Sequence, residues 1–145
     1  MKFLRVSLAS LTAAIAGIHA GHDVDPTSMI NGVSFETRAH WMRLANQALS
    51  DISGSPCPFA AFGTVIVNHT DSTTGKLICM GINENRKTGN PTLHGEIVAI
   101  TNCTAILTDP QGDFRLTAAE AQKAFSDLSL YTNAESCPMV HLLHL

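Results

Sequence analysis

The chain has 145 residues, of which 45% are hydrophobic and 14% are charged. This length fits one globular domain, and so apolar a composition excludes an intrinsically disordered chain. Nine basic residues against twelve acidic ones give a formal net charge of −3. Because the net charge is negative and no stripe of basic residues could follow a phosphate backbone, we expect a small-molecule partner and no nucleic-acid partner.

The N-terminal residues have the pattern of a secretory signal. Lys2 and Arg5 precede a mostly apolar run, and small residues follow up to Ala20. The run is shorter than the ~20 residues that span a bilayer, which favours a cleaved signal over a membrane anchor. We expect a secreted protein that is not associated with a membrane in its mature form. The predicted organisation is a signal peptide over 1–20, an N-terminal arm over 21–33 and a domain over 34–145.

Hydrophobic periodicity predicts helices that alternate with short buried strands. This alternation indicates an α/β domain with helices on the faces of a sheet. In chain order we expect a helix capped by Ser34 and ending near Gly54, a strand at 62–67 and its hairpin partner at 77–82. A polar loop at 83–90 then leads to an apolar helix that ends near Asp109. We expect a further helix at 117–125, a strand at 128–132, and a last helix with Cys137 in its first turn.

Four cysteines leave the choice between disulfides and metal binding open. Cys57, Cys79, Cys103 and Cys137 could form two disulfides in any of three pairings in an oxidising compartment. We expect Cys79, on a strand, and Cys103, within a helix, to be small buried hydrophobic residues. Cys137 is either a metal ligand or a disulfide partner of one of the other three.

Two motifs contain residues suited to catalysis. His94-Gly95-Glu96 lies at the start of the helix that follows Pro91, and Cys137 lies at the start of the last helix. Each follows a polar loop that leaves a predicted strand, so both could project from the same end of the sheet. The pattern H-x-E followed by P-C-x-x-C is typical of zinc-dependent base deaminases.

Longer stretches make the chain resemble the cytidine and deoxycytidylate deaminase superfamily, in particular its nucleobase and tRNA-adenosine deaminase branch. Their order and separation agree over roughly residues 35–139; the stretches are 62–67, 80–83, 90–100 and 130–139. The resemblance implies a three-layer α/β/α fold with a mixed sheet of strand order 2-1-3-4-5. It also allows a homodimer.

The resemblance implies a role for each candidate site residue. His94 would be a zinc ligand, Cys137 the first thiolate ligand and Glu96 the proton shuttle. Asn83 would bind the substrate base, and the backbone N–H of Gly95 would help to hold the reacting group. Zinc lowers the pKa of a bound water towards ~7, so the expected reaction is hydrolytic deamination. The substrate would be a free nucleobase or nucleoside, and a purine base such as guanine is favoured.

The chain departs from this pattern at one ligand. Val140 stands where the family has its second thiolate, and the match ends at Met139. We therefore expect the fold to lack the C-terminal strands and helix of the family, as in a truncated gene product. His141 is a weak substitute ligand, because residues four apart share a helix face. The alternative function is a non-catalytic secreted α/β domain held by disulfides.

Overall fold

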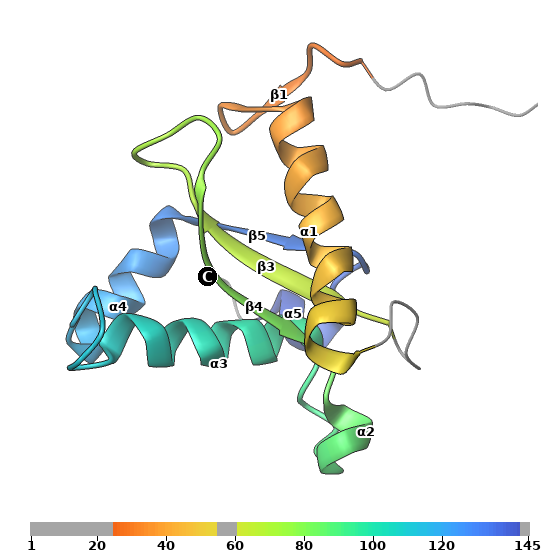
Figure 1. Ribbon diagram of the computed structural model, residues 1–145, viewed down its shortest axis with the longest axis vertical. Helices are drawn as coiled ribbons and strands as arrows, with labels where there is room; N and C mark the ends of the chain where they lie inside the picture. Colours follow the sequence, from red (N-terminus) through yellow and green to blue (C-terminus); the bar gives the residue numbers. More distant parts are fainter. Residues whose placement is uncertain (1–24, 55–60, 143–145) are drawn as a thin grey trace, which may run out of the picture.

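The computed structural model describes residues 25–54 and 61–142. In these residues a three-stranded sheet lies between helix α1 on one face and helices α3 and α4 on the other (Figure 1). The predicted signal peptide over 1–20 and Cys57 lie outside the described residues.

Helix α1 covers one face of the sheet. It runs over Phe35–Ser53, Ser34 caps its N-terminus by accepting a hydrogen bond from Thr37 N, and Gly54 ends it in the left-handed conformation at φ 72°. A glycine adopts that conformation without steric cost, so the helix stops where the sequence predicts. The apolar side of α1 includes Trp41 and Ala45, which pack against the sheet.

Strand β3 is the centre of the sheet. β3 (Gly63–Asn68) pairs with β4 (Lys76–Ile82) as a hairpin and with β5 (Leu128–Thr132) on its other side, so the order is β4-β3-β5. This order confirms the first three positions of the expected 2-1-3-4-5 arrangement. Both pairs are antiparallel, so the described sheet is not the mixed sheet we expected. β4 follows β3 through a hairpin turn and so runs against it. The crossover through α3 and α4 then returns β5 in the direction of β4, so both neighbours of β3 are antiparallel to it.

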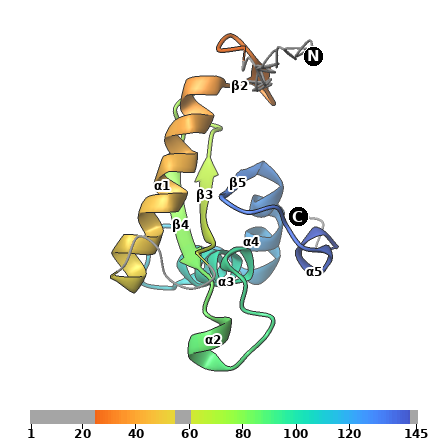
Figure 2. The ribbon, with the colours of Figure 1, turned by 90° about the vertical axis from the view of Figure 1, so that its right-hand side faces the viewer.

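Successive side chains of β3 point to opposite faces of the sheet, and this alternation produces the three layers. Val65 and Val67 face α1, whereas Ile66 packs with Ala99 and Cys103 of α3 (Gly95–Thr108). Figure 2 shows α1 on one side of β3 and β4, and α3 with α4 on the other. Because both faces of β3 are covered, three consecutive side chains are almost fully excluded from water; they are Val65, Ile66 and Val67.

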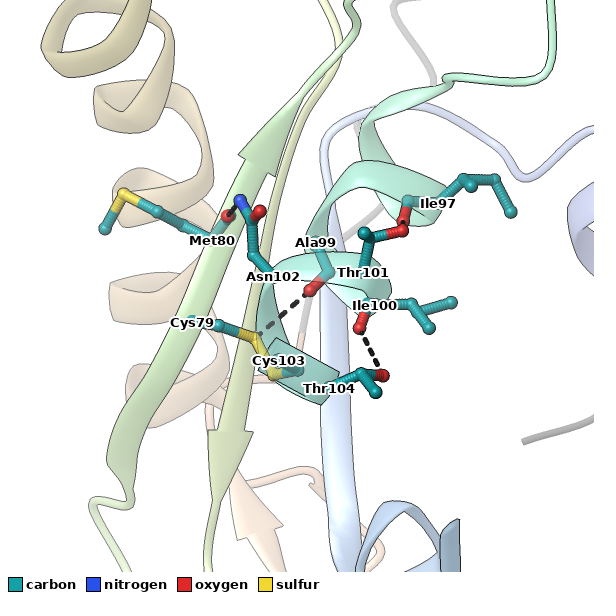
Figure 3. The surroundings of a disulfide bond; sticks show 9 residues. All are labelled: Cys79, Met80, Ile97, Ala99, Ile100, Thr101, Asn102, Cys103 and Thr104. Atoms are coloured by element: carbon teal, nitrogen blue, oxygen red, sulfur yellow. Dashed lines mark hydrogen bonds between the residues drawn. A yellow bond between two sulfur atoms is a disulfide. The ribbon is translucent and has the colours of Figure 1, made fainter. Parts of the chain in front are cut away.

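Helix α3 lies unusually close to β4. A Cβ atom added at Gly81 would lie 2.3 Å from the backbone nitrogen of Ala99, so only glycine permits this approach. Beside it a disulfide joins Cys79 of β4 to Cys103 of α3, with 5.2 Å between their Cα atoms (Figure 3). The Sγ of Cys79 also lies 3.4 Å from the carbonyl oxygen of Ala99. The prediction that both cysteines are buried is confirmed. Among the pairings that the sequence left open, the structure joins these two, because the helix comes close enough for a bridge.

The remaining elements are short. β1 lies in the predicted arm and pairs with β2 at the end of that arm, and a helical turn lies within the predicted polar loop. Their bounds, with those of the helices before and after β5, are β1 Met29–Ile30, β2 Val33–Ser34, α2 Asn85–Thr88, α4 Ala118–Ala124, η1 Phe125–Asp127 and α5 Pro138–His141. Thr117 and Glu120 form a capping box at the start of α4.

A polar contact links the turn after β3 to β5 on the α1 side of the sheet. His69 Nε2 lies 2.9 Å from the hydroxyl oxygen of Tyr131, and Trp41 Nε1 donates a hydrogen bond to the carbonyl of Thr74 at 2.8 Å. Burial lowers the pKa of His69, because desolvation disfavours the charged imidazolium. Among the helices in the described ranges, none has the length and apolarity to cross a bilayer.

Candidate functional site

His94 is placed by the loop between β4 and α3. It is the N-cap residue of α3, and its backbone carbonyl accepts the hydrogen bond from Val98 N. The loop before it is tied down because Glu84 N donates to the carbonyl of Leu93, and Asn90 Oδ1 accepts from both the N and the Oγ1 of Thr92. The half-buried imidazole therefore projects from a well-defined point at the end of the sheet.

Cys137 is placed near the same point by the segment between β5 and α5. It is the N-cap residue of α5, and the segment leading to it is anchored by Asn133. Asn133 Oδ1 accepts a hydrogen bond from Gly63 N at 2.9 Å, and its Nδ2 donates to Asn46 Oδ1 and to the carbonyl of Ala61. The Sγ of Cys137 lies 3.5 Å from Nδ1 of His94. Two predicted ligands 43 residues apart in sequence are thus brought together.

This spacing fits two ligands of one zinc ion. Zn–N and Zn–S bonds of about 2.0 and 2.3 Å, at a tetrahedral angle, place the two donor atoms about 3.5 Å apart. The separation of the His94 and Cys137 donors has that value. Across residues 25–54 and 61–142, however, no three His, Cys, Asp or Glu side chains stand close enough together to hold a metal. The two donors therefore fit zinc in type and spacing, and the described residues place no third donor beside them.

Glu96 is a buried carboxylate beside this pair. Its side chain is in the first turn of α3, and the residue is only 3% exposed. Ser136 Oγ donates a hydrogen bond to Glu96 Oε1 at 3.3 Å. Cys137, and not Ser136, is the N-cap residue of α5, so the Ser136 hydroxyl is available to Glu96. A buried carboxylate with one hydroxyl partner is suited to exchanging protons with a neighbouring molecule.

Gly95 and Asn83 meet at the same backbone carbonyl. A Cβ atom at Gly95 would lie 2.7 Å from the carbonyl oxygen of Phe62, and Asn83 N donates to that oxygen at 2.9 Å. The side-chain Oδ1 of Asn83 accepts a hydrogen bond from Asn85 N, which fixes the orientation of the carboxamide. The carbonyl of Phe62 therefore places the predicted substrate-binding residues at one end of β3.

An open pocket adjoins Cys137. Its volume is about 560 Å³, and its lining residues are Glu135, Ser136, Cys137, Pro138 and His141. Val140, at the position where a second thiolate was expected, is half-buried. His141 N donates to the carbonyl of Cys137 at 2.9 Å, so one helical turn separates these residues.

Two residues of the site were not identified as such from the sequence. No motif in the sequence marks Asn133 or Ser136 as a site residue, whereas the structure uses Asn133 to hold the Cys137 segment and Ser136 to bond Glu96. The only signal was their clustering of polar side chains just after a strand, where functional loops of α/β domains lie.

Comparison with known proteins places the chain in a family. The model of the cytidine and deoxycytidylate deaminase zinc-binding region matches residues 35–141. No curated protein sequence matches the chain. The region is a zinc-binding one, so Zn²⁺ is the cofactor that His94 and Cys137 would hold. The alternative of a non-catalytic secreted domain receives no support from these comparisons.

Two solved structures are similar to the chain. The guanine deaminase from Bacillus subtilis is 26% identical, with a TM-score of 0.46, over 71% of this chain and 54% of that one. A structure from studies of A-to-I editing by tRNA:A34 deaminases at the wobble position of transfer RNA is 24% identical, with a TM-score of 0.42, over 71% of this chain and 64% of that one. The chain thus spans less than two thirds of either structure. On the family match over residues 35–141, it belongs to the cytidine and deoxycytidylate deaminase family, of which it contains the zinc-binding region.

Proposed function

We propose that this chain is a zinc-dependent hydrolytic deaminase that releases ammonia from a free nucleobase or nucleoside. The observation that carries the proposal is the meeting of three groups from two distant segments. His94 and Cys137 present donor atoms 3.5 Å apart, and the buried carboxylate of Glu96 is bonded to the residue next to Cys137. A purine base such as guanine is the favoured substrate, because the resemblance of the stretch 135–139 to purine-base deaminases implies it.

Each site residue has its own role in the proposed reaction. His94 and Cys137 would hold zinc, which would supply an acidified water molecule as the nucleophile. Glu96 would accept a proton from that water and return it to the ring nitrogen and the departing amine. The exchange is redox-neutral: one C–O bond forms, one C–N bond breaks, and water and the amine become a carbonyl product and ammonia. Ser136 holds the carboxylate in place during both transfers.

Asn83 is the residue we propose for recognising the base. Its Oδ1 is occupied by Asn85 N, and within the described part of the chain its Nδ2 group has no protein partner. The Nδ2 group can therefore donate to a carbonyl or ring nitrogen of a base. A panel of free bases and nucleosides, with ammonia measured for each, tests the preference for a purine.

Substitution of Glu96 by Gln tests the reaction. We expect the zinc content to be unchanged and ammonia release to fall by at least about 100-fold, because an amide cannot carry the proton. Glu36→Gln is the matched control, since Glu36 is also an acidic residue in the first turn of a helix but is exposed on α1. Ammonia release that persists in Glu96→Gln would reject Glu96 as the shuttle.

We also propose that the protein is secreted. The support within the described residues is the buried disulfide between Cys79 and Cys103, since disulfides persist mainly in oxidising compartments. Sequencing the N-terminus of protein recovered from the culture medium tests this. A mature N-terminus near Gly21 is the expected result, and retention inside the cell with Met1 intact would contradict it.

A further inference from the structure

Two stretches of the sequence have the Asn-x-Thr pattern that accepts N-linked glycans. They are Asn68-His69-Thr70 and Asn102-Cys103-Thr104. Such a glycan is bulky and is found on surface loops of secreted proteins. Neither stretch takes part in the proposed reaction. The proposed secretion would expose both to modification, so their surroundings in the fold decide between them.

The first stretch presents its asparagine to solvent at the point where β3 ends and the turn to β4 begins. Asn68 Oδ1 accepts hydrogen bonds from the N and the Oγ1 of Thr70, at 2.7 and 2.6 Å, so the carboxamide and the hydroxyl of the motif stand side by side. Within the part of the chain that the structure describes, Asn68 Nδ2 has no protein partner. In that same part, His69 Nδ1 is the only buried side-chain nitrogen or oxygen without a partner, so Asn68 Nδ2 is open to water.

The middle residue of this stretch fixes its orientation. His69 contacts the hydroxyl of Tyr131 through Nε2 and lies edge-on to the ring of Trp41, with 6.4 Å between the ring centroids. Val67 also faces α1, and successive side chains of a strand point to opposite faces. Asn68 therefore points away from α1, while His69 attaches the turn to the α1 side of the sheet.

The second stretch lies inside helix α3, where its polar groups are engaged. Asn102 is exposed as a residue, but its Nδ2 donates a hydrogen bond to the carbonyl of Met80 at 2.9 Å (Figure 3). The Oγ1 of Thr104 donates to the carbonyl of Ile100 at 2.9 Å. Residues two apart on a helix do not face each other, so the carboxamide and the hydroxyl of this motif point apart. A glycan here would also stand beside Cys103, which has to approach β4 to form the disulfide.

We propose that Asn68 is the residue through which the secreted chain carries an N-linked glycan, and that Asn102 stays unmodified. The inference rests on the proposed secretion. The donor is an oligosaccharide activated by a diphosphate group. Asn68 Nδ2 forms a bond to the anomeric carbon of the sugar, the C–O bond to the diphosphate breaks, and the amide loses one proton. The transfer is redox-neutral.

The position of Asn68 keeps the glycan away from the candidate site. The site adjoins the other end of β3, where Gly63 N is bonded to Asn133 ahead of Cys137. Figure 1 shows the turn between β3 and β4 at one end of the sheet and α5 at the other. A glycan on Asn68 therefore leaves the pocket beside Cys137 open.

Expression of the full chain in a eukaryotic secretory cell tests the proposal. The mass of protein recovered from the medium is measured before and after treatment with an amidase that releases N-linked glycans. We expect the wild type to lose the mass of one glycan, and Asn68→Gln and Thr70→Ala to be secreted without it. Thr70→Ser, which keeps the motif, and Asn102→Gln, the matched control, should both retain the glycan.

Peptide mapping of the treated wild type locates the glycan without any variant, because the amidase converts the modified asparagine to aspartate. We expect that conversion at Asn68 and an intact Asn102. Secreted wild type without a glycan, or a conversion at Asn102, would overturn this inference alone. Wild type retained inside the cell with Met1 intact would overturn the proposed secretion together with it. Neither result bears on the deaminase proposal, which ammonia release tests separately.

Discussion

The two halves of the site differ in how strongly the fold holds them. The half that carries His94 and Glu96 begins a 14-residue helix whose side chains at Ala99 and Cys103 are fully buried, and which a disulfide joins to the sheet. The half that carries Cys137 begins a four-residue helix in which no residue is buried. Its attachment to the sheet depends largely on the hydrogen bonds of Asn133.

Because of this difference, we expect global stability and metal affinity to respond to different substitutions. Local stability follows buried apolar contacts, so the α3 half should unfold only with the whole domain, and the Cys137 half should open at much lower cost. A metal that binds both halves selects the closed arrangement and stabilises the weaker one. Variants in the first half should therefore change global stability, and variants in the second should change metal affinity.

The largest effect is expected from Gly81→Val. Its side chain would meet the backbone of Ala99 and Gly95, which cannot move without displacing α3. We expect the free energy of unfolding to fall by about 4 kcal/mol or more, the range of the most damaging single substitutions. Urea unfolding followed by circular dichroism measures it.

Gly89→Ala provides the control for Gly81→Val. Gly89 has a positive φ of 73°, but nothing lies within 4 Å of an added Cβ. The cost should be limited to about 1–2 kcal/mol of backbone strain. Equal losses in the two variants would show that α3 does not depend on close contact with β4.

A smaller effect is expected from removing the disulfide by Cys79→Ala/Cys103→Ala. The two cysteines are 24 positions apart, and closing a loop of that length stabilises a domain by about 3.5 kcal/mol in the chain-entropy treatment. Thermal unfolding should show a clear decrease in the double variant, and a similar decrease for the reduced wild type. Zinc affinity measured in the folded state should change little, and a large change would contradict the separation of the two halves.

The smallest effect on stability is expected from Asn133→Ala. It leaves the buried Gly63 N–H without its partner, which costs about 1–2 kcal/mol. The same change frees the segment before Cys137, so zinc affinity should fall about 10-fold, as for other outer partners of metal ligands. Asn46→Ala, which removes one exposed bond of the same network, is the control and should have a weaker effect on both. Unaltered zinc affinity in Asn133→Ala would show that the segment is held by other contacts.

Local signals were sufficient to predict most of the elements. Ser34 and Gly54 mark the ends of α1 because capping and left-handed turns depend on residues within a few positions. Strand β5 has the predicted bounds, since Tyr131 and Thr132 favour strands and the two leucines supply apolar positions. The turn α2 was missed because a four-residue helix has too few positions to show a period.

The features that escaped the sequence depend on distances between remote residues. The pairing of Cys79 with Cys103 follows from the approach of α3 across Gly81, which no local pattern records. The hydrogen bond from Ser136 to Glu96 likewise joins residues 40 positions apart. His94 and Cys137 could be placed at one end of the sheet because strand topology constrains where loops lie, but their spacing of 3.5 Å could not be inferred.

The disulfide described above also closes a covalent ring. Residues 80–102 lie inside it, including Asn83, His94 and Glu96. The exposed residues Arg86 and Lys87, which trypsin recognises, lie on the same ring. A single cut after either residue would open the backbone but leave both pieces attached through Cys79 and Cys103. A chain nicked at this point would therefore migrate as one molecule until a reductant is added, and all of its candidate site residues would remain covalently connected.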